Sequence, residues 1–173
     1  MKDHPMVLIV MGSDSDLHVM REAKAALEEL EIPCRMTVAS AHRDPSRAIH
    51  LAQEAASKGI RVIIAGAGAA AHLAGLMAAH TLLPVIGVPI DSSPLQGFDS
   101  LLATVQMPPG VPVATMAVGK AGARNAGILA GQILALGSPE IRERLVAARE
   151  GMVISLREKA ARVERGVDLS KDE

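Results

Sequence analysis

Residues 40–45, Ser-Ala-His-Arg-Asp-Pro, place a histidine beside an arginine. An imidazole exchanges a proton near neutral pH, so His42 is a candidate general acid and base. A guanidinium group can hold a phosphate through two parallel hydrogen bonds, so Arg43 is a candidate phosphate ligand. The alternative for His42 is an ordinary solvated loop histidine. A functional role is favoured because both residues lie between an apolar run and a helix start at Asp44-Pro45.

Residues 11–16, Met-Gly-Ser-Asp-Ser-Asp, form a second polar segment directly after an apolar run. At the start of a helix, free backbone N–H groups and the helix dipole attract an anion, and Ser13 and Ser15 add hydroxyl donors. The Asp16 carboxylate is suited to accept hydrogen bonds from ribose hydroxyls. The glycines and lysine of a Walker loop or a dinucleotide fingerprint are absent. Capping of the helix by Ser and Asp is the alternative interpretation.

Residues 66–73, Gly-Ala-Gly-Ala-Ala-Ala-His-Leu, follow a third apolar run. Such small residues let the backbone approach a ligand, and they equally suit close packing against another helix. His72 is either part of a site or a histidine of the core. No spacing of Cys, His and carboxylates resembles a metal site, and no nucleophile elbow is present.

The composition excludes several classes of partner. The 173-residue chain has 18 basic and 19 acidic residues, so its formal net charge of −1 gives no electrostatic footprint for nucleic acid or an anionic membrane. Phe98 is the only aromatic residue, and Cys34 is the only cysteine, which excludes an internal disulfide. No secretion signal precedes the first apolar run, so we expect a cytoplasmic protein.

The chemical segments are separated by alternating strand-like and helix-like patterns. Residues 62–90 carry no Asp, Glu, Lys or Arg, but glycines and prolines interrupt them, so they predict strand, helix and strand instead of a membrane span. The pattern predicts a three-layer α/β fold with a doubly wound parallel sheet, whose ligands bind beyond the carboxyl ends of the strands. The expected strands are Met6–Met11, Arg35–Ala39, Val62–Ala65, Val85–Val88 and Val113–Val118. The expected helices are 14–30, 44–58, 70–80, 97–106, 121–136 and one from about 138.

We expect residues 1–173 to form a single catalytic domain. The last helix opens at Ser138-Pro139 and carries an apolar stripe of Ile141, Leu145, Met152 and Leu156. This stripe requires a surface to cover, either on its own domain or on a neighbouring subunit.

In order and register, these segments resemble the PurE family, the carboxyaminoimidazole ribonucleotide mutases, of the class I type. The resemblance runs from about Val7 to Leu136. It is carried by MGSDSD (11–16), SAHRDP (40–45), AGAGAAAHLAG (65–75), PVIGVP (84–89), VQMPPGVPVAT (105–115) and NAGILA (125–130).

The resemblance implies a flavodoxin-like fold, a homo-octamer and a cofactor-free isomerase of purine biosynthesis. It implies that a carboxyl group moves from the exocyclic amine of a small ribonucleotide to the imidazole carbon, with His42 as the acid and base. The implied substrate-binding residues are Ser13, Ser15, Asp16, Ser40, Ala41, Arg43, Gly68, Ala69, His72 and Leu73. Two positions depart from the family pattern: Ala69 replaces a usual glycine and Ala74 a usual proline.

Two alternative functions remain to be separated from the mutase. The first is an aminoimidazole ribonucleotide carboxylase that uses free carbon dioxide. The second is a non-enzymatic flavodoxin-like signalling or binding module. A signalling receiver requires acidic residues at the strand ends, where this chain has Met11-Gly12 and Ala65-Gly66. A flavin module requires aromatic loop residues, which are absent.

Overall fold

A five-stranded parallel sheet forms the centre of the protein, in a computed structural model that describes residues 4–165. Its spatial order is β2-β1-β3-β4-β5, the doubly wound order typical of flavodoxin-like folds. The ends of the predicted 1–173 domain, residues 1–3 and 166–173, lie outside the described residues. The strands are β1 (Val7–Met11), β2 (Cys34–Val38), β3 (Val62–Gly68), β4 (Val85–Ile90) and β5 (Ala114–Thr115).

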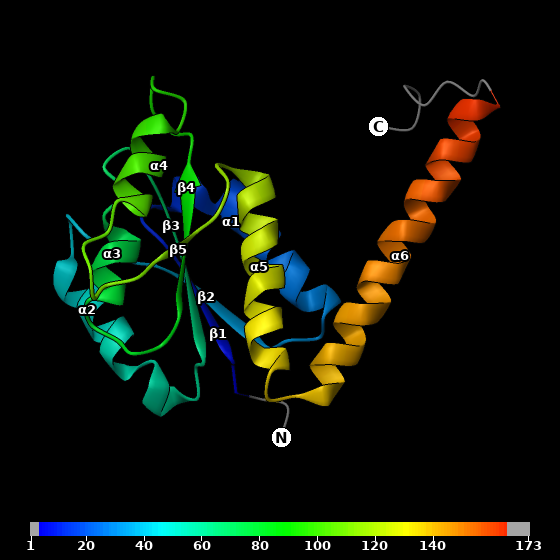
Figure 1. Cartoon of the computed structure of the whole chain (residues 1–173). Coiled ribbons are helices and arrows are strands. Elements are labelled where there is room, and N and C mark those ends of the chain that lie inside the picture. Colours follow the sequence, from blue (N-terminus) through cyan, green and yellow to red (C-terminus); the bar gives the residue numbers. More distant parts are fainter. Residues whose placement is uncertain (1–3, 166–173) are drawn as a thin grey trace.

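Helices cover both faces of this sheet and form the two outer layers (Figure 1). Residues alternate in direction along a strand, so β1 sends Val7 and Ile9 into one apolar core and Leu8 and Val10 into the other. The first core lies under α1 and α5, and the second lies under α2 and α3. The helices of the two layers are α1 (Leu17–Glu29), α2 (Pro45–Glu54), α3 (Leu73–Ala78), α4 (Phe98–Val105) and α5 (Lys120–Ala135).

The predicted α/β class with a doubly wound parallel sheet is confirmed, and the largest differences from the expected boundaries are in β3, α3 and β5. β3 continues to Gly68 because its small residues still pair with β4, as in Gly68 with Ile90. α3 begins only at Leu73, since tight turns occupy the residues before it. β5 has two residues instead of six, although Met116 and Gly119 still donate to carbonyl groups of β4.

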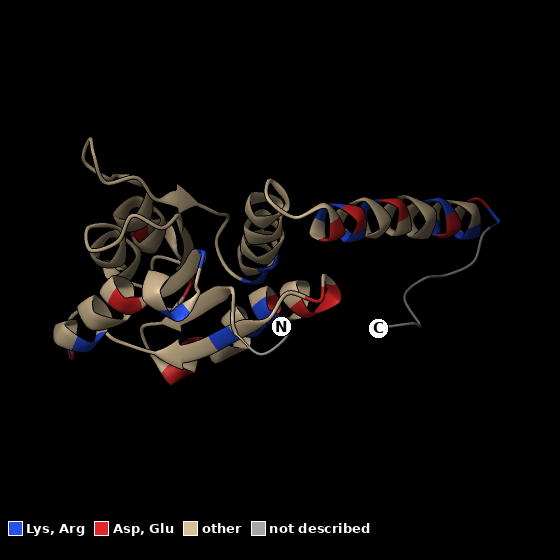
Figure 2. Ribbon diagram, turned by 90° about the horizontal axis from the view of Figure 1, so that it is seen from below, with Lys and Arg blue, Asp and Glu red and all other residues tan. Residues whose placement is uncertain are grey.

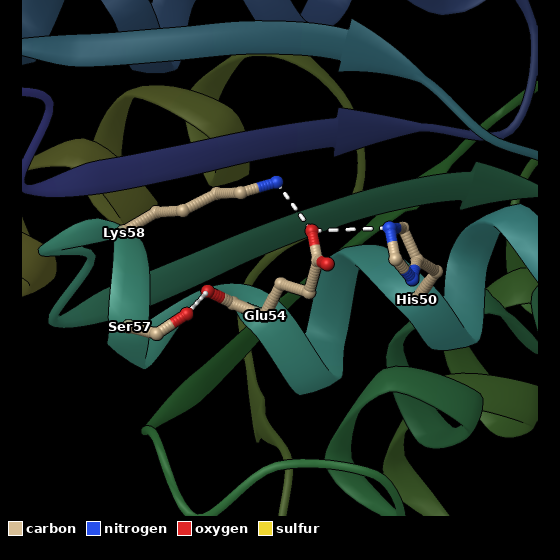
Figure 3. Close-up of polar contacts among 4 residues, drawn as sticks. All are labelled: His50, Glu54, Ser57 and Lys58. Carbon is tan, nitrogen blue, oxygen red and sulfur yellow. Dashed lines mark hydrogen bonds and ion pairs between the residues drawn. The ribbon is translucent and has the colours of Figure 1, made fainter.

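α2 ends in a short 3-10 turn, Ala56–Lys58, and Gly59 has the left-handed φ of +85° expected of a terminating glycine. Its last turns carry a local ion-pair cluster (Figure 3). The Glu54 carboxylate accepts a hydrogen bond from Lys58 and lies 3.0 Å from His50 Nε2. The hydrogen bond from Lys58 lowers the pKa of the Glu54 carboxyl. All three side chains project from the same face of one helix.

α6 (Pro139–Glu164) extends away from the three layers as an arm (Figure 1). Its first turns pack on the domain: Ile141 is buried, and Leu145 contacts the core beneath α1 and α5. Met152 and Leu156, from the predicted stripe, are exposed. Figure 2 shows basic and acidic residues alternating along the arm. Within residues 4–165, no helix is long and apolar enough to cross a membrane.

Candidate active site

The carboxyl ends of four adjacent strands surround a pocket of about 340 Å³. It lies at the switch point between β1 and β3, where strand order reverses and where this fold class binds its ligands. Every site residue predicted from the sequence lines it except Ala69. The lining consists of Gly12, Ser13, Ser15, Asp16, Ser40, Ala41, His42, Arg43, Ala67, Gly68, Ala70, His72, Leu73 and Ser92.

The residues of the turn after β1 both cap the following helix and line the pocket. The Ser13 hydroxyl accepts a hydrogen bond from the Ser15 N–H at 3.4 Å and donates one to Asp14 at 3.1 Å. The Asp16 carboxylate accepts the Ser13 N–H at 3.1 Å, which completes a capping box. The capping role considered for this segment is therefore present, and the same residues line the pocket.

Among residues 4–165, Asp16 is the one acidic side chain that is buried, with 5% of its surface exposed. Burial raises the pKa of its carboxyl, and the hydrogen bond from the Ser13 N–H opposes this shift. A carboxylate that has lost most of its water and retains free lone pairs is a strong acceptor for a ligand hydroxyl.

Arg43 crosses from the loop after β2 to the end of β1. Its Nη2 donates to the Gly12 carbonyl at 3.1 Å, and its backbone N–H donates to the Ser40 hydroxyl at 3.1 Å. Within residues 4–165, its Nη1 group has no hydrogen bond to the protein. The guanidinium is thus held beside the Ser13 turn with N–H donors still available to an anion.

His42 meets His72 across the pocket. His42 Nε2 and His72 Nδ1 are 2.7 Å apart, and the rings meet edge to face with their centroids 4.8 Å apart. Two imidazole nitrogens at this distance hold one proton between them, with one ring donating and the other accepting. His42 comes from the loop after β2 and His72 from the start of α3, so the sheet brings together residues far apart in the sequence.

A strained loop carries His72 into this position. Ala69 has a φ of +50°, in the left-handed region that favours glycine, which is the residue expected there from the family pattern. Two tight turns follow, in which the Ala71 N–H donates to the Ala69 carbonyl and the His72 N–H to the Ala70 carbonyl. Ala69 itself is exposed beside the pocket and does not line it.

Sequence reasoning missed Ser92, which lines the pocket from the loop after β4. It also did not assign Ala67, which contributes to the walls together with the expected small residues Gly12 and Ala70. The available signal for Ser92 was its place directly after an apolar strand, the position that Ser13 and Ser40 share after their strands. Within the described residues, no three His, Cys, Asp or Glu side chains gather as metal ligands would.

Comparison with known proteins places this geometry in a family. The family described as AIR carboxylase matches residues 6–154. A Pyrococcus horikoshii protein named N5-carboxyaminoimidazole ribonucleotide mutase is 54% identical over 162 residues, covering 94% of this chain and 90% of that protein. A Thermotoga maritima protein of the same name is 53% identical over 161 residues and 93% of each chain.

A third relative and a solved structure extend the comparison. A Schizosaccharomyces pombe protein named phosphoribosylaminoimidazole carboxylase is 50% identical over 163 residues, covering 94% of this chain but only 29% of that longer protein. The crystal structure of Treponema denticola PurE has a TM-score of 0.81 over 91% of this chain and 98% of that chain, at 24% identity, and supports the fold. The resemblance drawn from the sequence motifs is confirmed: the chain belongs to the AIR carboxylase family.

Proposed function

We propose that this protein is an N5-carboxyaminoimidazole ribonucleotide mutase of purine biosynthesis. It converts 5-(carboxyamino)imidazole ribonucleotide to 5-amino-1-(5-phosphoribosyl)imidazole-4-carboxylate. The proposal rests chiefly on the pair of His42 and His72, 2.7 Å apart in a pocket that also contains anion-binding groups. Relatives more than 50% identical over most of the chain carry this name.

The phosphate of the substrate binds at the ends of β1 and β2 in this proposal. Ser13 and Ser15 offer backbone and hydroxyl donors there, and Arg43 supplies the charge. The buried Asp16 carboxylate accepts hydrogen bonds from the ribose hydroxyls. Ser40, Ala41, Gly68 and Leu73 shape the walls around the imidazole.

His42 moves the proton in both half-reactions. Cleavage of the bond between the exocyclic nitrogen and the carboxyl carbon releases carbon dioxide, and His42 supplies the proton that nitrogen gains. The ring carbon then attacks the carbon dioxide, and His42 removes the proton that this carbon loses. Because His72 shares a hydrogen bond with His42, it fixes the ring and stabilises the tautomer that each step requires. Neither step calls for a redox or metal cofactor.

A mutase must hold its carbon dioxide between the two steps, whereas a carboxylase must admit it from solvent. The wall formed by Gly68 and Ala70 is small and uncharged, which suits retention of a small apolar molecule. Ala69, which the resemblance implied as a further substrate-binding residue, is exposed and does not line the pocket. The carboxylase name of one relative makes free carbon dioxide the alternative that an experiment must test.

Label transfer in a single turnover tests this function. Substrate labelled in its carboxylate is incubated with the pure protein, without ATP or metal, in unlabelled bicarbonate buffer. We expect the ring-carboxylated product with most of the label retained. Extensive loss of label, or efficient use of the uncarboxylated ribonucleotide at low bicarbonate, would assign the carboxylase reaction instead.

We also propose a homo-oligomer, an octamer, that works in the cytoplasm. A cavity of about 600 Å³ opens between α1, α5 and α6, with an apolar lining that includes Ile128, Leu129 and Met152. The outer part of α6 adds further exposed apolar residues, among them Val146, Ile154, Leu156 and Val163. Symmetric burial against other copies of the chain covers such surfaces. Light scattering tests this, and a stable, active monomer would contradict it.

A further inference from the structure

Ser92 lies at the carboxyl end of β4 and lines the pocket beside Gly68. A Cβ atom added to Gly68 would lie 1.7 Å from the Ser92 Oγ and 2.8 Å from its Cβ. The serine therefore occupies the space that any side chain at position 68 would fill. Because Gly68 has no side chain, the Ser92 hydroxyl, from the loop after β4, fits against the end of β3.

The hydroxyl of Ser92 is not used to build its own loop. Within residues 4–165 it forms no hydrogen bond with the protein. Its neighbour Ser93 differs: its hydroxyl accepts the Leu95 N–H at 3.1 Å, and its carbonyl accepts the Gln96 N–H at 3.0 Å. Ser93 thus stabilises the loop, while the Ser92 hydroxyl remains available to a molecule in the pocket.

The position of Ser92 in the sheet indicates which part of a ligand it meets. The proposed anion-binding groups lie at the ends of β1 and β2. In the sheet, β3 follows β1 on the side away from β2, and β4 is the next strand after β3. Adjacent strands are about 4.8 Å apart, so β4 lies roughly 10 Å from β1. A ribonucleotide held by its phosphate at β1 reaches this distance with its ring and the substituents of the ring.

We propose that the Ser92 hydroxyl donates a hydrogen bond to the carboxylate of the carboxylated imidazole, and so distinguishes carboxylated from uncarboxylated ribonucleotides. This inference rests on the proposed function and adds a specificity-determining residue to it. Ser92 supplies a neutral donor, which stabilises the carboxylate without holding it as tightly as a cation would. The migrating group thereby keeps a fixed orientation near His42 and His72.

Binding of two ligands to Ser92→Ala tests the inference. Isothermal titration measures Kd for the ring-carboxylated ribonucleotide and for the same compound without its carboxylate. We expect Ser92→Ala to weaken binding of the carboxylated ligand by about 10-fold, the scale of a lost hydrogen bond to a charged group. Binding of the uncarboxylated ligand should change by less than about 2-fold, because its phosphate and ribose contacts remain.

Ser93→Ala is the matched control. It removes a loop hydrogen bond but no pocket hydroxyl, so it should lower Tm and leave the ratio of the two Kd values unchanged. Equal effects of Ser92→Ala on both ligands, or no effect on either, would overturn the role of Ser92 while leaving the mutase assignment intact. Failure of the wild-type protein to bind either ligand would instead overturn the proposed function and this inference with it.

Discussion

Two histidines near each other in the sequence make polar contacts of similar length in different surroundings. His42 in the pocket meets His72 at 2.7 Å, a partner from the start of another helix, α3. His50 on α2 meets Glu54 at 3.0 Å, a partner one turn along the same helix (Figure 3). The first contact exists only when the whole sheet is assembled, whereas the second requires a single helix.

The difference concerns what each histidine is available to do. The Glu54 carboxylate is itself paired with Lys58, so His50 belongs to a solvated cluster on a helix surface. Such exposed pairs contribute little to stability. His42 has a second imidazole as its partner and lines a pocket, so it can exchange a proton with His72 or with a molecule bound there. The two histidines differ less in the length of their contacts than in where the partner comes from, which is another part of the fold for His42 and the same helix for His50.

The largest effect is expected from His42→Asn. The loop side chain packs little, so folding and assembly should be preserved. Turnover should fall by about 100-fold or more, the usual scale for loss of a general acid and base. Circular dichroism and light scattering would establish the fold, and a single-turnover assay would measure the rate. Near-normal turnover in a folded variant would remove His42 from the chemistry.

Arg43→Lys tests the neighbour of His42 in the same loop. The lysine keeps the positive charge but loses the planar fork that donates to the Gly12 carbonyl and that, in the proposed role, also donates to the phosphate. We expect substrate binding to weaken by roughly 1–3 kcal/mol, measured by titration calorimetry. A nucleotide-soaked crystal gives an independent check: a phosphate lying away from residues 12–16 and 43 would contradict the assignment.

Asp16→Asn is expected to change how the thermal stability of the protein depends on pH. Burial raises the pKa of the folded carboxyl, so this group contributes stability below its unfolded pKa and loses that contribution as pH rises through the folded pKa. Asparagine keeps the acceptor for the Ser13 N–H but does not ionise. The Tm of the variant should therefore rise relative to wild type as pH increases from about 4 to 7. A pH-independent difference would show that burial of the charge carries no cost.

His50→Gln should have the smallest effect. Its ring is mostly exposed and its partner keeps the contact with Lys58. Turnover should change by less than about 2-fold, and Tm by about 1 °C or less. A loss of activity comparable to that of His42→Asn would contradict the comparison, because it would give the surface histidine His50 a role in turnover as large as that of His42.

The sequence predicted the elements with distinctive patterns and missed those whose residues permit several structures. The strand ends before Ser13 and His42 were predictable because strand-like segments stop there and helix-starting residues follow. The boundary around Ala69 was not, since Gly and Ala alternate there and fit a strand, a turn or a helix equally well. Ser92 was missed because it reaches the pocket beside Gly68, and these two residues become neighbours only when β3 pairs with β4.

Because α6 projects from the domain, we expect the thermal stability and protease resistance of the protein to depend on protein concentration. In the outer turns of α6, the apolar side chains of Met152, Ile154 and Leu156 are exposed within the described residues. A short helical segment without buried apolar contacts is marginally stable in water. If other copies supply the missing contacts, mass action links the order of the arm to protein concentration. Dilution should then lower Tm and expose the arm to proteases at concentrations where the three layers remain folded.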